Sequence, residues 1–102
     1  MARLLVMYKT PRDASAFDKH YFDKHVPIAK KIPGLRKYEI SQGAVATPAG
    51  ASPYYLVAIL HFDDVAAIQA AFGSPEGKVA VDDLQKFASA GVDIFMFESR
   101  DA

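Results

Sequence analysis

The nine residues Tyr54–Phe62, YYLVAILHF, constrain the fold more than any other part of this chain. Successive side chains of a strand point to opposite faces of its sheet, so an unbroken apolar run must be covered on both sides. We therefore expect this run to be a central strand. The segments Leu4–Tyr8 and Val92–Glu98 are similarly apolar and predict two further strands. Lys37–Ser41 alternates polar with apolar residues, which suits an edge strand.

Capping residues and helix breakers predict three helices, over about residues 15–31, 65–72 and 75–90. With the strands, they give the order strand, helix, strand, strand, helix pair, strand. Right-handed crossovers then place the strands in the spatial order fourth, first, third, second. We predict an α+β fold, the ferredoxin-like βαββαβ plait, with a four-stranded antiparallel sheet and helices on one face. Residues 1–102 are expected to form a single domain.

The predicted helices can cover only one face of the sheet. Three of its strands are nevertheless apolar on both faces, as Leu4–Leu5, Leu56–Leu60 and Ile94–Phe97 show. An uncovered apolar face of this size on a monomer would aggregate or bind a partner. We expect a homodimer in which two sheets pack face to face. The alternative is a groove for a larger hydrophobic ligand or another protein.

Composition narrows the classes of partner. The chain has 12 Lys and Arg and 12 Asp and Glu residues, so its formal net charge is +0. The composition therefore gives no excess of basic residues that would predict binding to nucleic acid. It has no cysteine, which excludes disulfides and thiolate chemistry. No apolar run approaches the length of a membrane span, so we expect a cytoplasmic protein with no membrane partner.

The first predicted helix carries the candidate site. Stepped at about 100° per residue, it has one apolar side, and His25 lies in the middle of that side. The apolar residues are Phe17, Tyr21, Ile28, Ala29 and Ile32. His20 falls on the opposite, charged side, which predicts that His20 and His25 cannot share a metal. Pro27 removes one backbone donor, so we expect a kink just past His25.

His25 and Tyr38 are predicted to lie at one level, between the first helix and the second strand. An imidazole that titrates near neutral pH and a phenol can move a proton together, one as base and the other as donor. His25 and Tyr38 are therefore the candidate catalytic residues. Phe17 and Tyr21 would wall the pocket for a flat or aromatic ligand. His61, near the end of the third strand, is a third candidate ligand-binding residue.

Each of these residues also has a structural interpretation. His25 is equally well explained as a buried core histidine bonded to the carbonyl that Pro27 leaves free. Phe17 and Tyr21 can be core packing, and His61 can belong to the dimer interface. No spacing of His, Asp or Glu residues predicts a metal site, so we expect none.

Residues 43–53, GAVATPAGASP, consist mostly of small residues, Gly and Pro. This composition predicts a loop that is long for a connection between two paired strands. Two interpretations remain open, a flap over a pocket and a surface loop without a role.

The segments FDKHYFDKHVPIA (residues 17–29) and IPGLRKY (residues 32–38) resemble the EthD family, within the wider group of dimeric α/β-barrel proteins. The later segments LHFDDVAAIQAAFGSPEG (residues 60–77) and DDLQKF (residues 82–87) are similar to the second half of that family. The resemblance implies a ferredoxin-like subunit, a homodimer whose facing sheets form a barrel, and a pocket between helix and sheet in each subunit. The family is named for ethyl tert-butyl ether degradation.

The resemblance also implies a class of function. Similar barrels include cofactor-independent isomerases, cyclases, decarboxylases and monooxygenases; where these use a helix histidine and a strand tyrosine, His25 and Tyr38 match. We expect binding of a small hydrophobic or aromatic metabolite and, if the protein is an enzyme, lyase or isomerase chemistry without a cofactor. The alternative is a non-catalytic ligand-binding or accessory protein of a degradation pathway, with His25 structural. A third option is redox catalysis with an external haem or flavin, which a bound chromophore would reveal.

Overall fold

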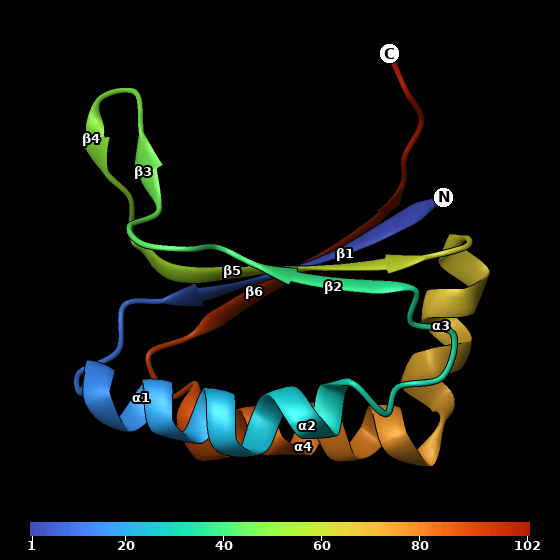
Figure 1. Cartoon of the computed structure of the whole chain (residues 1–102), viewed down its shortest axis with the longest axis horizontal. Helices are drawn as coiled ribbons and strands as arrows, with labels where there is room; N and C mark the ends of the chain where they lie inside the picture. The colour runs from blue at the N-terminus through green and yellow to red at the C-terminus, as the bar shows by residue number, and fades with distance from the viewer.

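The computed structural model describes residues 1–102 and shows a four-stranded antiparallel sheet with the helices on one side (Figure 1). The strands are β1 (Ala2–Lys9), β2 (Lys37–Ile40), β5 (Tyr54–Phe62) and β6 (Val92–Glu98). Their spatial order is β2-β5-β1-β6, with antiparallel pairing throughout. This is the order expected from the sequence, and the ferredoxin-like βαββαβ fold is confirmed.

Four α-helices and one π-helical turn connect the strands. In chain order they are α1 (Ala14–His20), the turn η1 (Tyr21–His25), α2 (Val26–Ala29), α3 (Val65–Gly73) and α4 (Pro75–Phe87). The first three are continuous and form one long segment that lies alongside α4 (Figure 1). Side-chain oxygens of Asp13, Asp64 and Ser74 accept hydrogen bonds from the first turns of α1, α3 and α4.

The long helical segment is irregular before His25 rather than after it. The Val26 N–H group bonds to the carbonyl of Tyr21, five residues earlier, which is the hydrogen bond of a π-helix. Pro27 then stands in the first turn of α2, where a missing N–H group is tolerated. The sequence predicted a kink just past His25. The structure instead has a wider helical turn that ends at His25.

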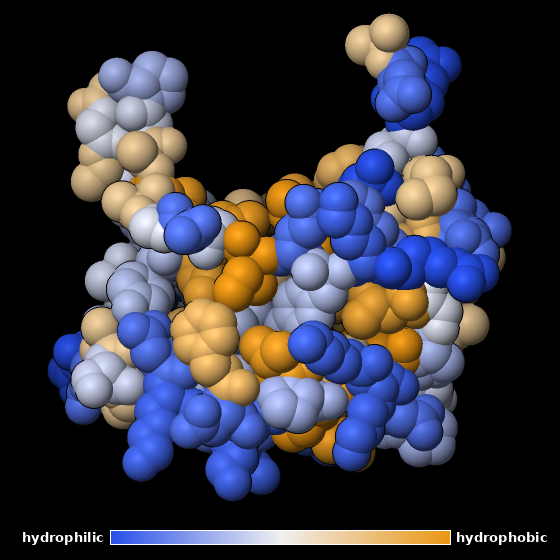
Figure 2. All heavy atoms as spheres, in the orientation of Figure 1, coloured by the Kyte–Doolittle hydropathy of each residue, from blue (hydrophilic) through white to orange (hydrophobic).

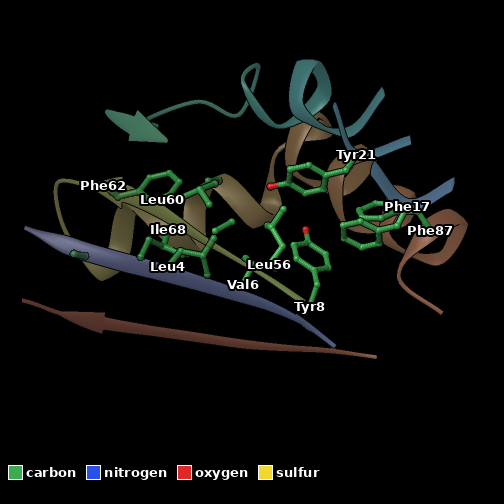
Figure 3. Packing of buried hydrophobic residues seen from close by; sticks show 13 residues of the cluster. Leu4, Val6, Tyr8, Phe17, Tyr21, Leu56, Leu60, Phe62, Ile68 and Phe87 are labelled. Carbon is green, nitrogen blue, oxygen red and sulfur yellow. The ribbon is translucent and has the colours of Figure 1, made fainter. Parts of the chain in front are cut away.

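The core lies between the sheet and the helices (Figure 3). Its thirteen buried residues are Ala2, Leu4, Val6, Tyr8, Phe17, Tyr21, Leu56, Ala58, Leu60, Phe62, Ile68, Ala71 and Phe87. At one end the aromatic rings pack closely, with centroids 5.3 Å apart for Phe17 and Phe87 and 5.5 Å apart for Tyr8 and Tyr21. This aromatic group adjoins His25, whose ring centroid lies 4.8 Å from that of Phe87.

No element of the chain covers the other face of the sheet. Along β1, residues on the helix side are buried, whereas Leu5 and Met7 on the other side are only half-buried. The strand register places Leu5 between Ile59 and Phe95, so an apolar row crosses three strands. Phe95 and Phe97 are 54% and 42% exposed. We call this the open sheet face, and its apolar residues are Leu5, Met7, Val57, Ile59, Phe95 and Phe97.

The hairpin of β3 (Ala46–Thr47) and β4 (Gly50–Ala51) projects from the sheet on the side away from the helices, as does the C-terminal tail (Figure 1). Hydrophobic residues are visible on the surface between these two projections (Figure 2). At its base the hairpin borders a groove of about 470 Å³, and Phe22 and Tyr55 also line this groove. None of the helices combines the length and the apolar character that crossing a membrane requires.

Candidate functional site

His25 lies between the helices and the sheet and is only 5% exposed. Its Nδ1 atom is 2.9 Å from Oδ2 of Asp83, on α4. Its Nε2 atom is 3.5 Å from the hydroxyl oxygen of Tyr8, on β1. Because a carboxylate only accepts hydrogen bonds, Nδ1 carries the proton in this pair, and Nε2 of the neutral ring is free to accept one.

Asp83 also binds a second histidine. Nε2 of His20 lies 3.1 Å from Oδ1 and 3.0 Å from Oδ2 of this carboxylate. The expectation that His20 and His25 lie on opposite helix sides is wrong. In an α-helix, residues five apart are about 140° apart around the axis, but a π-helical turn brings them close to one side. The turn Tyr21–His25 therefore directs both rings at Asp83.

Sequence reasoning missed Asp83 and Tyr8 as neighbours of His25. On α4, the apolar residue Val79 is 53% exposed, whereas the charged residue Asp83 is 4% exposed, so apolar character alone does not predict which side of this helix is buried. One signal could have found Asp83, since it falls three residues after Ala80 and four before Phe87, on their side of α4. A charged residue at such a position indicates a partner inside the fold.

Burial sets the protonation of this cluster. Removal from water lowers the pKa of His25, and the hydrogen bond to Asp83 opposes that shift only in part. The ring is therefore neutral at pH 7. Burial alone would raise the pKa of Asp83, but hydrogen bonds from His25 and His20 hold it below its ordinary value. Burial raises the pKa of Tyr8, which stays a neutral phenol.

A cavity of about 50 Å³ opens beside His25. Thirteen of its fifteen lining residues are hydrophobic, and the lining includes Tyr8, His25, Tyr38, Ala80, Val81 and Ile94. Val81 and Ile94 are 41% and 39% exposed, so the mouth of the cavity lies between α4 and β6. Its volume is room for roughly three or four waters.

The structure brings His25 and Tyr38 to the walls of the same cavity. The hydroxyl groups of Tyr38 and Tyr21 lie 2.6 Å apart, within one hydrogen bond. Tyr21 is fully buried, and its hydroxyl points into the layer between helices and sheet (Figure 3). Burial raises the pKa of Tyr38, so this phenol is neutral and can donate. Phe17 packs against Tyr8 and Tyr21 but does not line the cavity.

His61 lies on the opposite side of the sheet from His25. It pairs across strands with Arg3 and with Lys37, and its Nε2 atom is 2.5 Å from Oε1 of Glu39. It does not line the cavity, and any contact that it makes with a ligand or partner is on the open sheet face. No group of three or more His, Cys, Asp or Glu side chains is arranged to hold a metal ion.

The cavity side chains allow one kind of chemistry. A neutral imidazole held at Nδ1 by a carboxylate can take a proton at Nε2, and a neutral phenol across the cavity can donate to a nearby oxygen. The apolar lining would strengthen both interactions by excluding water.

The family model for the EthD domain matches residues 9–91, which include His20, His25, Tyr38 and Asp83. The chain belongs to the EthD family. A crystal structure of an EthD family protein from Bacillus halodurans is 36% identical, covers 98% of this chain and 99% of that one, and superposes with a TM-score of 0.89. An uncharacterised 11.0 kDa protein encoded in the thcB–thcC intergenic region of Rhodococcus erythropolis is 40% identical over 90% of this chain and 88% of its own length.

More distant structures share the fold of this EthD protein. A dimeric ferredoxin-like protein of unknown function from Jannaschia sp. CCS1 is 20% identical, with a TM-score of 0.72 over 96% of this chain and 98% of that one. SnoaB, a cofactor-independent oxygenase from Streptomyces nogalater, is 14% identical, with a TM-score of 0.69 over 99% and 94% of the two chains. At these identities the likeness concerns the fold.

Proposed function

We propose that this EthD protein is a homodimer that binds a small hydrophobic or aromatic metabolite beside His25 and moves a proton without a cofactor. His25 is the base and Tyr38 is the hydrogen-bond donor. One observation carries the proposal, the position of Nε2 of His25 beside an apolar cavity while Asp83 holds Nδ1.

The chemistry is a proton transfer between carbon and nitrogen. Nε2 of His25 takes the proton of an acidic C–H bond, and the electron pair moves onto an adjacent carbonyl oxygen, to which the Tyr38 hydroxyl donates a hydrogen bond. Asp83 stabilises the imidazolium that forms. Return of the proton to a different carbon is an isomerisation. SnoaB, which has this fold, is a case of catalysis without a cofactor.

The open sheet face supports the homodimer. Its apolar row crosses β5, β1 and β6, and the hairpin and C-terminal tail flank it (Figure 1). Several structures with this fold are described as dimeric. A second copy of the chain would cover the row with an identical one.

The ligand has to be small or has to widen the cavity. A volume of about 50 Å³ lies below the roughly 150 Å³ of an engineered cavity that accepts benzene. The mouth between Val81 and Ile94 is apolar, so a flat ligand can extend outward between α4 and β6. This favours hydrophobic ligands with one polar group aimed at His25.

A test with 1-indanone, a flat aromatic ketone with acidic C–H bonds beside its carbonyl, follows from this geometry. In D₂O we expect the wild-type protein to accelerate deuterium incorporation at the carbon next to the carbonyl at least ~10-fold over buffer. A positioned base typically accelerates such a proton transfer by about 10²–10⁴. His25→Gln should abolish the acceleration with an unchanged circular dichroism spectrum. Ala80→Leu should block binding by filling the cavity, whereas Ala70→Leu, at an exposed site on α3, should not.

A second candidate function is favoured by the small volume of the cavity and by the two hydrogen-bond partners of His25. In that case the protein is a non-catalytic ligand-binding or accessory protein. Binding of 1-indanone that survives His25→Gln, with no deuterium incorporation by either protein, would support this function over catalysis.

A further inference from the structure

Two phenol groups, those of Tyr8 and Tyr38, line the cavity beside His25. The Tyr8 hydroxyl has one hydrogen-bond partner, Nε2 of His25, at 3.5 Å. This distance is long for a hydrogen bond, whose usual range is roughly 2.5–3.2 Å. Tyr8 is 2% exposed, so a hydroxyl proton that turns away from Nε2 has to find its acceptor inside the cavity.

The hydroxyl proton of Tyr38 also faces the cavity. The hydroxyl oxygens of Tyr21 and Tyr38 lie 2.6 Å apart, so one of the two groups donates to the other. Tyr21 is fully buried, and its hydroxyl points into the layer between helices and sheet without lining the cavity (Figure 3). If Tyr38 were the donor, the Tyr21 proton would have no acceptor, which is costly away from water. Tyr21 therefore donates, and the Tyr38 proton is left for a group in the cavity.

A ligand that engages His25 releases the Tyr8 proton as well. Nε2 has one lone pair, and a ligand hydrogen that points at it takes the place of the Tyr8 hydroxyl. The Tyr8 proton then has no acceptor in the protein. Burial raises the pKa of Tyr8, with further contributions from Tyr38 and Asp83, so the phenol keeps this proton. An occupied cavity therefore holds two phenol donors that need a ligand acceptor.

We propose that Tyr8 and Tyr38 together form an oxyanion site, in which one ligand oxygen accepts a hydrogen bond from each phenol. This inference rests on the proposed function, to which it adds Tyr8 as a second catalytic donor. Tyr21 links the two phenols, since its ring packs edge-on against Tyr8, with centroids 5.5 Å apart, while its hydroxyl bonds that of Tyr38.

The oxyanion site defines the chemical class of the ligand. A carbonyl oxygen can accept two hydrogen bonds, and it becomes more negative as His25 takes a proton from the neighbouring carbon. Hydrogen bonds to a charged acceptor are roughly twice as strong as those between neutral groups. The two phenols therefore stabilise an enolate more than the carbonyl compound from which it forms. The site favours ketones and esters with an acidic C–H bond over hydrocarbons of the same shape.

Phenol and toluene test the oxyanion site without any reaction. They have nearly the same shape, but only phenol has an oxygen, which is bonded to an sp² carbon as in an enolate. In NMR chemical-shift titrations at pH 7, we expect the wild-type protein to bind phenol at least ~10-fold more tightly than toluene, as hydrogen bonds from the two phenols would give.

Tyr8→Phe and Tyr38→Phe should each weaken phenol binding at least ~3-fold, the effect of losing about one hydrogen bond, without weakening toluene binding. Unchanged toluene binding shows that the cavity keeps its shape. Tyr54→Phe is the matched control. It also removes one phenol hydroxyl, but that group donates to Asp93 and does not line the cavity, so neither affinity should change.

Three outcomes would overturn the oxyanion site: no preference of the wild type for phenol, wild-type phenol affinity in Tyr8→Phe, or equal weakening of phenol and toluene binding in that variant. These titrations involve no proton transfer to or from carbon. Phenol binding that depends on Tyr8, with no deuterium incorporation into 1-indanone, would support the oxyanion site and contradict catalysis. Deuterium incorporation by a wild type that binds phenol no better than toluene would do the reverse.

Discussion

Asp83 accepts hydrogen bonds from two histidines while it is almost completely buried. A carboxylate in this position has no water to solvate it, so the imidazole N–H groups have to supply that stabilisation. His25 in turn is held in one orientation and one tautomer, with Nε2 toward the cavity. The behaviour of the candidate base thus depends on a residue that stands 58 positions away in the chain.

Replacing Asp83 with Asn tests this dependence. The amide keeps the size of the side chain but can present only one oxygen to two ring N–H groups. We expect the free energy of unfolding in urea at pH 7 to fall by about 1–3 kcal/mol, the range for a buried donor left without a partner. Asp82→Asn removes a charge from the exposed neighbour and should change stability by less than about 0.5 kcal/mol. Equal effects of the two substitutions would contradict the role given to Asp83.

The lowered pKa of His25 predicts a pH dependence of stability. Because the folded-state pKa lies below the ordinary value of 6.5, the unfolded chain binds a proton that the folded chain does not as the pH falls through that value. The free energy of unfolding should therefore decrease as the pH is lowered from about 7.5 to about 5.5. Asp83, whose pKa is lowered from 3.8, contributes only at more acid pH.

Urea titrations of wild type and His25→Gln over this pH range measure the contribution of His25. The groups that face its ring are Asp83, Tyr8, Tyr21 and, through Asp83, His20. The variant should lose much of the slope. Identical slopes in the two proteins would show that His25 does not titrate as described.

At the scale of elements, the arrangement depends on one π-helical turn and on one close contact between helices. The turn Tyr21–His25 rotates α1 relative to α2, so that Phe17 and Tyr21 still pack in the core while His20 reaches Asp83. The contact lies where α3 ends and α4 begins. There Gly77 is buried against the backbone of Ala71 and Phe72.

Gly77→Ala should destabilise the protein strongly. An added Cβ atom would collide with the carbonyl oxygen of Ala71, which is backbone and cannot move without shifting α3 against α4. We expect a loss of more than about 2 kcal/mol, in the range of other overpacked sites, measured by thermal or urea unfolding. Gly73→Ala, with open space around the new methyl group, serves as the control. Alanine is the better helix former there, so the control should be neutral or more stable by up to about 1 kcal/mol.

The sequence predicted the strands and helices well because their apolar spacing is regular and their caps are ordinary. Tyr54–Phe62 could be nothing but a central strand, and Asp13, Asp64 and Ser74 cap the helices as their residue types suggest. The π-helical turn was not predictable, since a helical wheel assumes a constant 100° step. That one assumption placed His20 on the wrong side and hid its contact with Asp83.

Two tyrosines of the candidate site show how far side-chain positions can be predicted from the sequence. Tyr38 was placed correctly at the level of His25, because strand and helix lengths alone determine that position. Tyr8 was read only as part of a buried strand, although its hydroxyl is the one near Nε2 of His25. The direction of a side chain in a central strand depends on register, and register is set by contacts across the sheet.

At the scale of the whole molecule, the open sheet face determines the proposed assembly. We expect wild type to sediment at twice the chain mass of 11.1 kDa. Phe95→Lys would place a charge in the middle of the apolar row and should give a folded monomer at micromolar concentration. Val79→Lys changes a residue of the same exposure on α4 and should remain dimeric. A monomeric wild type, or a dimer that Phe95→Lys leaves intact, would contradict assembly through this face.

The central claim is that a ligand meets His25 in the cavity. The most direct test follows the ring signals of the three histidines by NMR while 1-indanone is added to the wild-type protein. The account predicts saturable shifts of the His25 ring, smaller shifts of His20 through Asp83, and none of His61 on the open sheet face. Binding that shifts the His61 ring and leaves the His25 ring unchanged would contradict it.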